Sequence, residues 1–160
     1  MCGIAGFATE GGTAAPGIPP GPGNAPPAPQ GTPAAPGAPA LPGTEVTPPD
    51  VLGHRGPDGA RAVRWSAPGC AGLLVHTRLA IVDLSDAGRQ PITDEGGRLL
   101  VAFNGEIYNH LELRRLCESR GHRLAGGMDG DVIVHLWEDE GPDCLRRLNG
   151  IFAIAVVDRV

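Results

Sequence analysis

The stretch RLLVAFNGEIYNHLELRRLCESRG at residues 98–121 decides the fold of this chain. Residues 98–104 form an apolar run between two polar residues, which is typical of a strand buried on both faces. A helix is expected to open at Asn109, a favourable N-cap with Glu112 three residues later, as in a capping box. Leucines three residues apart give this helix an apolar face, and Gly121 is expected to end it.

Other apolar runs predict four further strands, a second helix and a helical turn. The strands are expected at residues 2–7, 62–65, 71–76 and 151–157, the helix at 130–140, and the turn at 143–148. Strands followed by helices and then a last strand, without regular alternation, favour the α+β class with sheets and helices in separate layers.

Residues 8–50 are expected to be a disordered, Pro/Gly-rich insertion. The 160 residues include 17 Pro, and 13 of these lie between residues 11 and 50. Proline removes backbone donors, and the segment offers almost nothing bulky to bury. Its PxxP spacings also allow a ligand for an SH3-type domain, although no basic residue flanks them. About 120 residues are left for one folded domain.

The net charge of −5 and the absence of any Arg-rich run argue against binding to nucleic acid or to an anionic membrane surface. No apolar run is long enough to span a bilayer, and the N-terminus does not have the pattern of a secretory signal. The four cysteines are widely spaced and match no zinc-site template, so no metal site is expected. A cytoplasmic protein is the resulting expectation.

Cys2 is the cysteine with a chemical interpretation. A small second residue permits removal of Met1, which leaves Cys2 with a free α-amino group. Such an amine has a pKa of roughly 7.7–8.0, so it can act as a base at neutral pH. Cys2 would thus carry both the nucleophile, its thiol, and the base that activates it, its α-amino group.

Several motifs occur in a fixed order along the chain. They are MCGIAGF at 1–7, HRGPDG at 54–59, HTRLAIVDLS at 76–85, GRQPI at 88–92, FNGEIYNHLELR at 103–114, MDGDVIVHLWEDEG at 128–141 and CLRRLNGIFAIAVVD at 144–158. Together they resemble the glutaminase domain of class II glutamine amidotransferases, and specifically the asparagine synthetases. The resemblance covers residues 1–7 and about 51–160.

The resemblance implies an N-terminal-nucleophile hydrolase fold, a four-layer αββα sandwich of antiparallel sheets. It also implies that Cys2 attacks the side-chain amide of L-glutamine, giving a γ-glutamyl thioester and ammonia. Asn104 and Gly105 would form the oxyanion hole, the first through its side-chain amide and the second through its backbone N–H.

The resemblance also assigns the substrate contacts. Arg78 would bind the α-carboxylate of glutamine, and Glu106 and Asp129 would bind its α-ammonium group. Backbone groups of four consecutive residues would line the same pocket: Leu79, Ala80, Ile81 and Val82. From the residues alone, other roles stay open. Arg78 is also suited to a surface ion pair, Asn104 to a turn before Gly105 and Asp129 to the N-cap of the second helix. The five histidines are interpreted as structural or surface residues.

The chain departs from the family pattern in three places. The insertion stands where the relatives have a helix, so part of the apolar sheet surface is expected to be under-covered. Met128 and Gly130 replace the residues that usually flank the aspartate. The domain, 1–160, is expected to be partial: its closing strands and the synthetase domain are absent.

The partners implied are L-glutamine and the C-terminal synthetase domain of a full-length relative, and a homodimer is compatible with the pattern. No cofactor is expected in this chain, since ATP and Mg²⁺ would serve only the synthetase domain. The function expected is glutamine hydrolysis as the ammonia-supplying half of asparagine synthesis from aspartate. Two alternatives stay open: a relative that amidates another carboxylate in specialised metabolism, and a non-catalytic truncated remnant.

Overall fold

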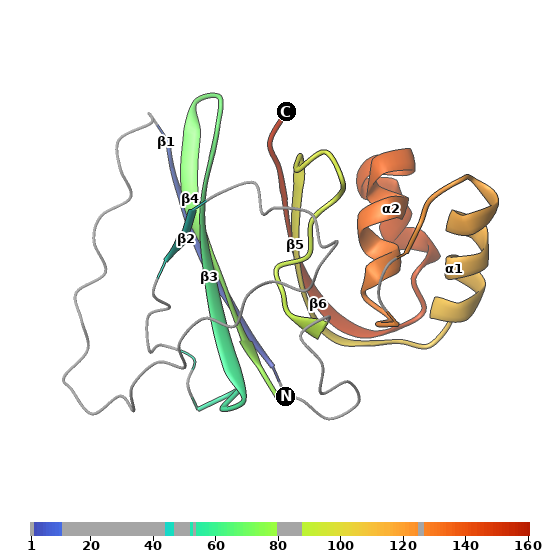
Figure 1. Cartoon of the computed structure of the whole chain (residues 1–160), viewed down its shortest axis with the longest axis horizontal. Helices are drawn as coiled ribbons and strands as arrows, with labels where there is room; N and C mark the ends of the chain where they lie inside the picture. Colours follow the sequence, from blue (N-terminus) through green and yellow to red (C-terminus); the bar gives the residue numbers. More distant parts are fainter. Residues whose placement is uncertain (1, 11–43, 47–51, 53, 80–87, 125–126) are drawn as a thin grey trace.

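Figure 1 shows the chain in a computed structural model, which describes residues 2–10, 44–46, 52, 54–79, 88–124 and 127–160. Three layers follow one another: a larger sheet, a two-stranded sheet and a pair of helices. The class is therefore α+β with separate layers of sheet and helix, as the order of the apolar runs predicted. No helix in the described part of the chain is long and apolar enough to cross a membrane.

The first layer is a four-stranded antiparallel sheet in the order β1-β4-β3-β2. Its strands are β1 (Gly3–Glu10), β2 (Thr44–Val46), β3 (Gly59–Ala67) and β4 (Cys70–Arg78). A two-residue turn joins β3 to β4, and its Gly69 has a φ of 78°. Only glycine adopts such a φ without strain, so this turn sets the register of the hairpin.

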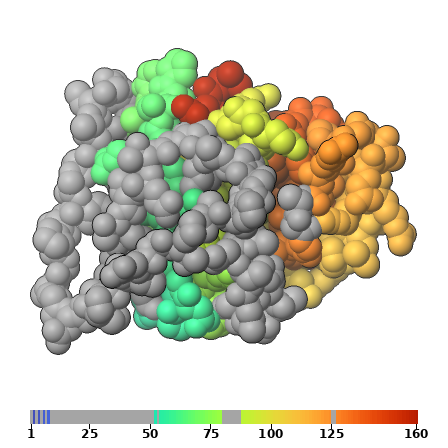
Figure 2. Space-filling view, viewed as in Figure 1, coloured from blue at the N-terminus to red at the C-terminus, as the bar shows by residue number. Residues whose placement is uncertain are grey.

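The second sheet pairs β5 (Leu99–Ile107) with β6 (Gly150–Asp158) in antiparallel register. The helices α1 (His110–Ser119) and α2 (Asp131–Glu140) cover its far side, and a short 3₁₀ helix (Gly141–Arg147) leads back to β6. In the space-filling view the helices form one end of the molecule (Figure 2).

Strand β5 is buried on both faces because its side chains alternate between two cores. Leu99, Val101 and Phe103 pack against the helices, and Leu100 and Ala102 pack against the larger sheet. All of them are at most 2% exposed. Period-two alternation explains this division, since successive side chains of a strand point to opposite faces.

The outer face of the larger sheet is better covered than the sequence suggested. Ala62, Leu73 and Val75 lie on that face and are at most 4% exposed. The expectation of an under-covered apolar surface is therefore wrong at these positions. Within the described residues, both helices lie on the β5–β6 side.

The structure differs from the predicted elements in three places. β1 continues to Glu10 and β2 occupies Thr44–Val46, so both ends of the predicted 8–50 insertion include strand. Most of that segment, residues 11–43, lies outside the described residues. The capping box at Asn109 is wrong because its side chain makes no cap hydrogen bond. Instead, its amide donates to the Arg147 carbonyl at 2.9 Å and accepts from the Asn149 N–H at 3.0 Å.

His76 ties the two sheets together. It stands on β4 and is 2% exposed, and its imidazole makes a hydrogen bond to the backbone of Phe103 on β5. Burial, together with the nearby charge of Arg78, lowers the pKa of His76 from 6.5 to about 4. Within the described residues its Nε2 atom has no hydrogen-bond partner. The imidazole is therefore neutral between the sheets at neutral pH.

Substituting Gly150 should weaken the pairing of β5 and β6. A Cβ atom at Gly150 would lie 2.0 Å from the backbone oxygen of Glu106, which cannot move without shifting the strand. We expect Gly150→Ala to lower the free energy of unfolding by about 1–3 kcal/mol in urea titrations. Gly59→Ala is the matched strand control, since its Cβ would meet nothing within 4 Å. Equal effects of the two substitutions would contradict the close approach.

Acid should destabilise the fold through His76. Its pKa is lowered on folding from 6.5 to about 4, so the unfolded chain takes up the proton first as the pH falls. The contribution is complete above the unfolded pKa and is lost as the pH falls towards the folded pKa. From about pH 7.5 to about pH 5 the loss should be about 2 kcal/mol.

The check is urea unfolding of the chain and of His76→Gln at both pH values. The variant should lose less stability than the parent, whereas His54→Gln, at an exposed position, should behave as the parent does. Identical pH dependence of parent and His76→Gln would contradict the assignment.

Candidate active site

Cys2 lies at the end of β4. It immediately precedes β1, and the antiparallel register places Gly3 opposite Thr77. The N–H of Leu79 donates to the Cys2 sulfur at 3.4 Å, and the thiol lies 3.9 Å from the carbonyl oxygen of Leu79. The half-buried thiol is thus held by the backbone just beyond β4, at the first of the residues expected to line the pocket.

The HRGPDG loop at 54–59 packs onto the backbone of Arg78. The Asp58 N–H donates to the Arg78 carbonyl at 3.1 Å, and Pro57 forms a parallel bridge with Arg78. A Cβ at Gly56 would lie 2.6 Å from the Arg78 nitrogen, so only glycine allows the loop this close. The loop therefore fixes the position from which the Arg78 side chain projects.

Gly88 brings the Arg78 side chain to the turn before α2. A Cβ at Gly88 would lie 2.4 Å from Nη2 of Arg78 and 3.2 Å from Sδ of Met128. The guanidinium and Met128 therefore both lie against Gly88. Because Met128 adjoins Asp129, two segments that the sequence assigns to substrate binding meet here.

Asp129 fastens this turn to the end of β5. Its Oδ2 accepts a hydrogen bond from the Ile107 N–H at 2.7 Å, and its Oδ1 accepts one from the Gly130 N–H at 3.0 Å. The N-cap of α2 is Gly130, without a side-chain cap hydrogen bond. A Cβ at Gly130 would lie 2.9 Å from the ring of Phe103, which explains a glycine at this position. The alternative of Asp129 as a helix N-cap is therefore wrong.

The predicted oxyanion residues lie where β5 leaves the core. Gly105 has a φ of 143°, and a Cβ there would lie 2.1 Å from the Ile151 carbonyl oxygen. Both facts require glycine. Asn104 is half-buried and Glu106 is exposed. No hydrogen bond or ion pair among the described residues engages the Asn104 side chain.

The predicted site residues gather in two groups on facing sheets. Cys2 and Arg78 lie at the end of the larger sheet, and Asn104, Gly105 and Glu106 lie on β5. The described contacts do not join Cys2 directly to Asn104 or Gly105, but β1 and β5 contact each other. Arg78 reaches the turn of Asp129 through Gly88 and Met128. Ala80, Ile81 and Val82 lie outside the described residues.

Three residues that hold this arrangement were not predicted from the sequence. Gln90 is buried and accepts a hydrogen bond from the Phe103 N–H at 2.5 Å, which fixes the strand just before Asn104. Gly88 lies between the Arg78 guanidinium and Met128. His76 joins the two sheets through its bond to Phe103. The GRQPI motif at 88–92 was the available signal for the first two residues. For His76, the available signal was the presence of a polar residue inside an apolar strand.

The chain is similar to curated proteins over about two thirds of its length. The chain is 43% identical over 109 residues to an asparagine synthetase [glutamine-hydrolyzing] of Brassica oleracea, covering 67% of this chain and 17% of that protein. It is 40% identical over 111 residues to asparagine synthetase [glutamine-hydrolyzing] 3 of Bacillus subtilis (strain 168), covering 68% and 17%. The chain thus spans about a sixth of the length of these relatives.

A solved structure of glutamine phosphoribosylpyrophosphate (PRPP) amidotransferase from B. subtilis, complexed with ADP and GMP, aligns with a TM-score of 0.46 and 23% identity. It covers 55% of this chain and 21% of that chain. The family described as "Glutamine amidotransferase domain" matches residues 45–160. Because this match spans more than half of the chain, the protein belongs to the glutamine amidotransferase domain family.

Proposed function

We propose that the chain hydrolyses L-glutamine to glutamate and ammonia through a thioester at Cys2. The observation that carries the proposal is the place of the Cys2 thiol, held by the Leu79 backbone at 3.4 Å beside Arg78. Membership of the glutamine amidotransferase domain family supports it. So do relatives whose names state that they hydrolyse glutamine.

The chemistry begins once Met1 has been removed. The free α-amino group of Cys2 takes the thiol proton, and the sulfur attacks the side-chain amide carbon of glutamine. Collapse of the tetrahedral intermediate breaks the carbon–nitrogen bond, and the proton leaves with ammonia. Water, deprotonated by the same amine, then attacks the thioester. This step releases glutamate and restores the thiol.

The groups that we assign to the substrate pocket fit the charges of this reaction. The Asn104 amide and the Gly105 N–H supply two neutral donors for the oxyanion of the tetrahedral intermediate. Arg78 offers a planar fork for the α-carboxylate, which a lysine does not match. Glu106 and Asp129 supply carboxylates for the α-ammonium group. Each end of a free amino acid thus meets the opposite charge.

In the whole protein we assign this reaction to the supply of ammonia for ATP-dependent asparagine synthesis from aspartate. The relatives carry the name asparagine synthetase, and this chain corresponds to 17% of their length. A synthetase domain outside the glutamine amidotransferase domain would bind ATP and Mg²⁺. A homodimer of the whole protein is part of the same proposal.

We also propose that the glutamine amidotransferase domain is a four-layer αββα sandwich. The two facing sheets and the helical layer behind β5–β6 account for three of these layers. A helical layer on the outer face of the larger sheet would be the fourth. A crystal structure of the protein with bound glutamine is the direct test of this architecture.

Replacing the nucleophile should abolish glutaminase activity. We expect Cys2→Ala to release no glutamate or ammonia above background, because the proposed thioester forms on the Cys2 sulfur. Cys70→Ala is the matched control, since Cys70 is half-buried at the start of β4 and has no assigned role. The N-terminal mass must first show that Met1 has been removed. Equal turnover by Cys2→Ala and the parent would overturn the proposal.

Removing the oxyanion donor should lower kcat and leave KM nearly unchanged. Loss of one such donor lowers kcat by about 100- to 1000-fold, because the bond is strongest in the transition state. We therefore expect Asn104→Ala to show this pattern in steady-state glutaminase assays. Asn149→Ala, at an exposed position, is the control. A rise in KM with unchanged kcat would place Asn104 in substrate binding instead.

A further inference from the structure

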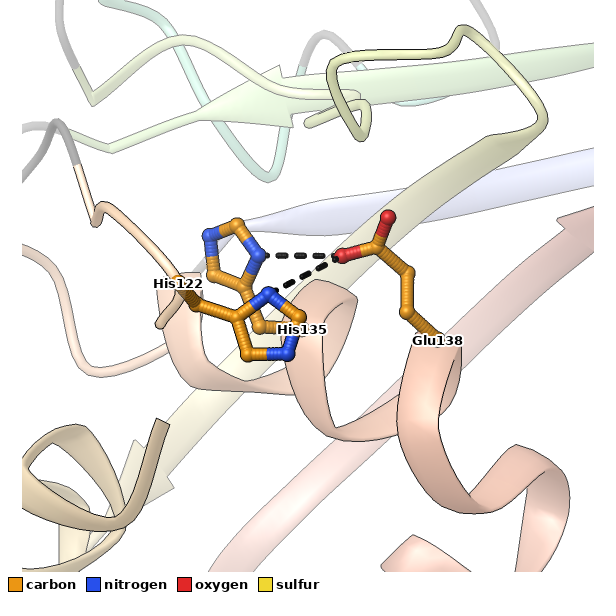
Figure 3. A group of neighbouring side chains, drawn as sticks. All are labelled: His122, His135 and Glu138. Carbon is orange, nitrogen blue, oxygen red and sulfur yellow. Dashed lines mark hydrogen bonds and ion pairs between the residues drawn. The ribbon is translucent and has the colours of Figure 1, made fainter. Parts of the chain in front are cut away.

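A cluster of two histidines and one glutamate lies in the helical layer, in addition to the proposed active site. One ligand atom of each of His122, His135 and Glu138 lies within 4.8 Å of the other two. Figure 3 shows both rings directed at a single carboxylate oxygen of Glu138. The side chains are 19%, 9% and 25% exposed, so the cluster is sheltered but open to solvent.

The backbone builds this cluster from two elements. His135 and Glu138 stand three residues apart on α2, which places them on one face of the helix. His122 is held at the end of α1 by a Schellman motif: its N–H donates to the Cys117 carbonyl at 3.1 Å, and the Gly121 N–H donates to the Glu118 carbonyl at 3.0 Å. The cluster therefore bridges the two helices.

The two separations from Glu138 to the histidines are close to those of a tetrahedral metal site. Oε2 of Glu138 lies 3.1 Å from Nδ1 of His135 and 3.7 Å from Nδ1 of His122. Zinc bonds to histidine nitrogen and carboxylate oxygen are about 2.0–2.1 Å long, which makes the edge of the tetrahedron about 3.3–3.4 Å. The two observed separations lie on either side of this value. A metal ion could thus enter with small side-chain movements.

A second carboxylate, that of Asp139, orients the His122 ring from the side opposite Glu138. Its Nε2 lies 3.0 Å from Oδ1 of Asp139, and Asp139 is held in turn by Arg120 at 2.9 Å. Metal-binding histidines commonly donate their other ring N–H to a carboxylate in this way, which fixes the tautomer. With Nε2 protonated for Asp139, the Nδ1 of a neutral ring keeps its lone pair and faces Glu138.

Arg120 and Arg147 form their ion pairs with carboxylates other than that of Glu138. Arg120 pairs with Asp139 and with Glu140, and Arg147 pairs with Glu140 at 2.6 Å. In the described part of the chain, the hydrogen bond and ion pairs of Glu138 are with the two imidazole rings. Its carboxylate therefore supplies a negative charge where two nitrogen lone pairs can converge.

We propose that His122, His135 and Glu138 bind one divalent transition-metal ion of the Zn²⁺ class, with Asp139 as the outer partner of His122. Two imidazoles and a carboxylate suit Zn²⁺ and its neighbours better than Mg²⁺, which prefers oxygen ligands. The ion would link the end of α1 to α2. It would thereby stabilise the helical layer behind β5 and β6.

Metal binding can be measured on the chain directly. After chelation and dialysis, the Cys2→Ala chain should bind one equivalent of Zn²⁺; this background removes the thiol nearest the N-terminus as a competing ligand. His135→Gln and Glu138→Gln should each weaken binding at least tenfold, and Asp139→Asn by about 10- to 100-fold. His54→Gln and Glu118→Gln are the matched controls and should bind as the parent does.

Co²⁺ absorption tests the ligand set without any substitution in the cluster. A four-coordinate imidazole and carboxylate site gives visible d–d bands without an intense near-ultraviolet band from sulfur. A strong sulfur-to-cobalt band would assign the metal to a cysteine and overturn the proposal. Binding of the same strength in His135→Gln and Glu138→Gln, confirmed as folded by circular dichroism, would also overturn it.

Stability gives a third, independent measurement. Zn²⁺ at about 100 times its Kd should raise the Tm of the chain by roughly 5–10 °C, because the ion binds the folded state only. Mg²⁺ at the same concentration should leave the Tm unchanged. An equal rise in Tm for Glu138→Gln would count against the cluster as the site.

Discussion

The close backbone approach between β5 and β6 is the constraint on which the rest of the structure depends. At one end of this pair, Gly105 and Gly150 lie where any Cβ would collide with the partner strand. The alternating side chains of β5 then fill the core between the sheets and the core beneath the helices. Strand β5 thus contributes to both cores, and Asn104 and Gly105 lie where it leaves them.

The apolar runs predicted most of the described fold because side chains that pack into a core leave a strong signal in the sequence. β4, β5, β6 and α2 all lie where such runs occur. The ends of the elements were less predictable, since tertiary contacts determine them. Asn109 is the N-cap of α1, as predicted, yet its side-chain amide bonds to the backbone of Arg147 and Asn149 and not to the helix. The preference of an N-cap side chain for its own helix was therefore overridden by hydrogen bonds to residues far away in the sequence.

The site could be predicted residue by residue only through the resemblance of its motifs. Spacing alone left Asn104 as a turn residue and Asp129 as a helix cap. Supporting residues such as Gly88 and Gln90 had no chemical signal of their own, because their role is to leave space or to bond a backbone N–H. The cluster of His122, His135 and Glu138 was missed for a related reason: its members come from α2 and from the turn after α1, and only the fold shows their separation.

Asp129 shows how one carboxylate can serve both structure and binding. An ionised carboxylate offers about four lone-pair directions. Hydrogen bonds from Ile107 and Gly130 use two of them and lock the turn before α2 onto the end of β5. The remaining directions stay available for an ammonium group in the proposed pocket. Because Glu106 adjoins Ile107, the bond that positions Asp129 also places it beside the part of β5 that carries Glu106. In the proposed pocket, the α-ammonium of glutamine would therefore meet an Asp129 carboxylate that is already held in place.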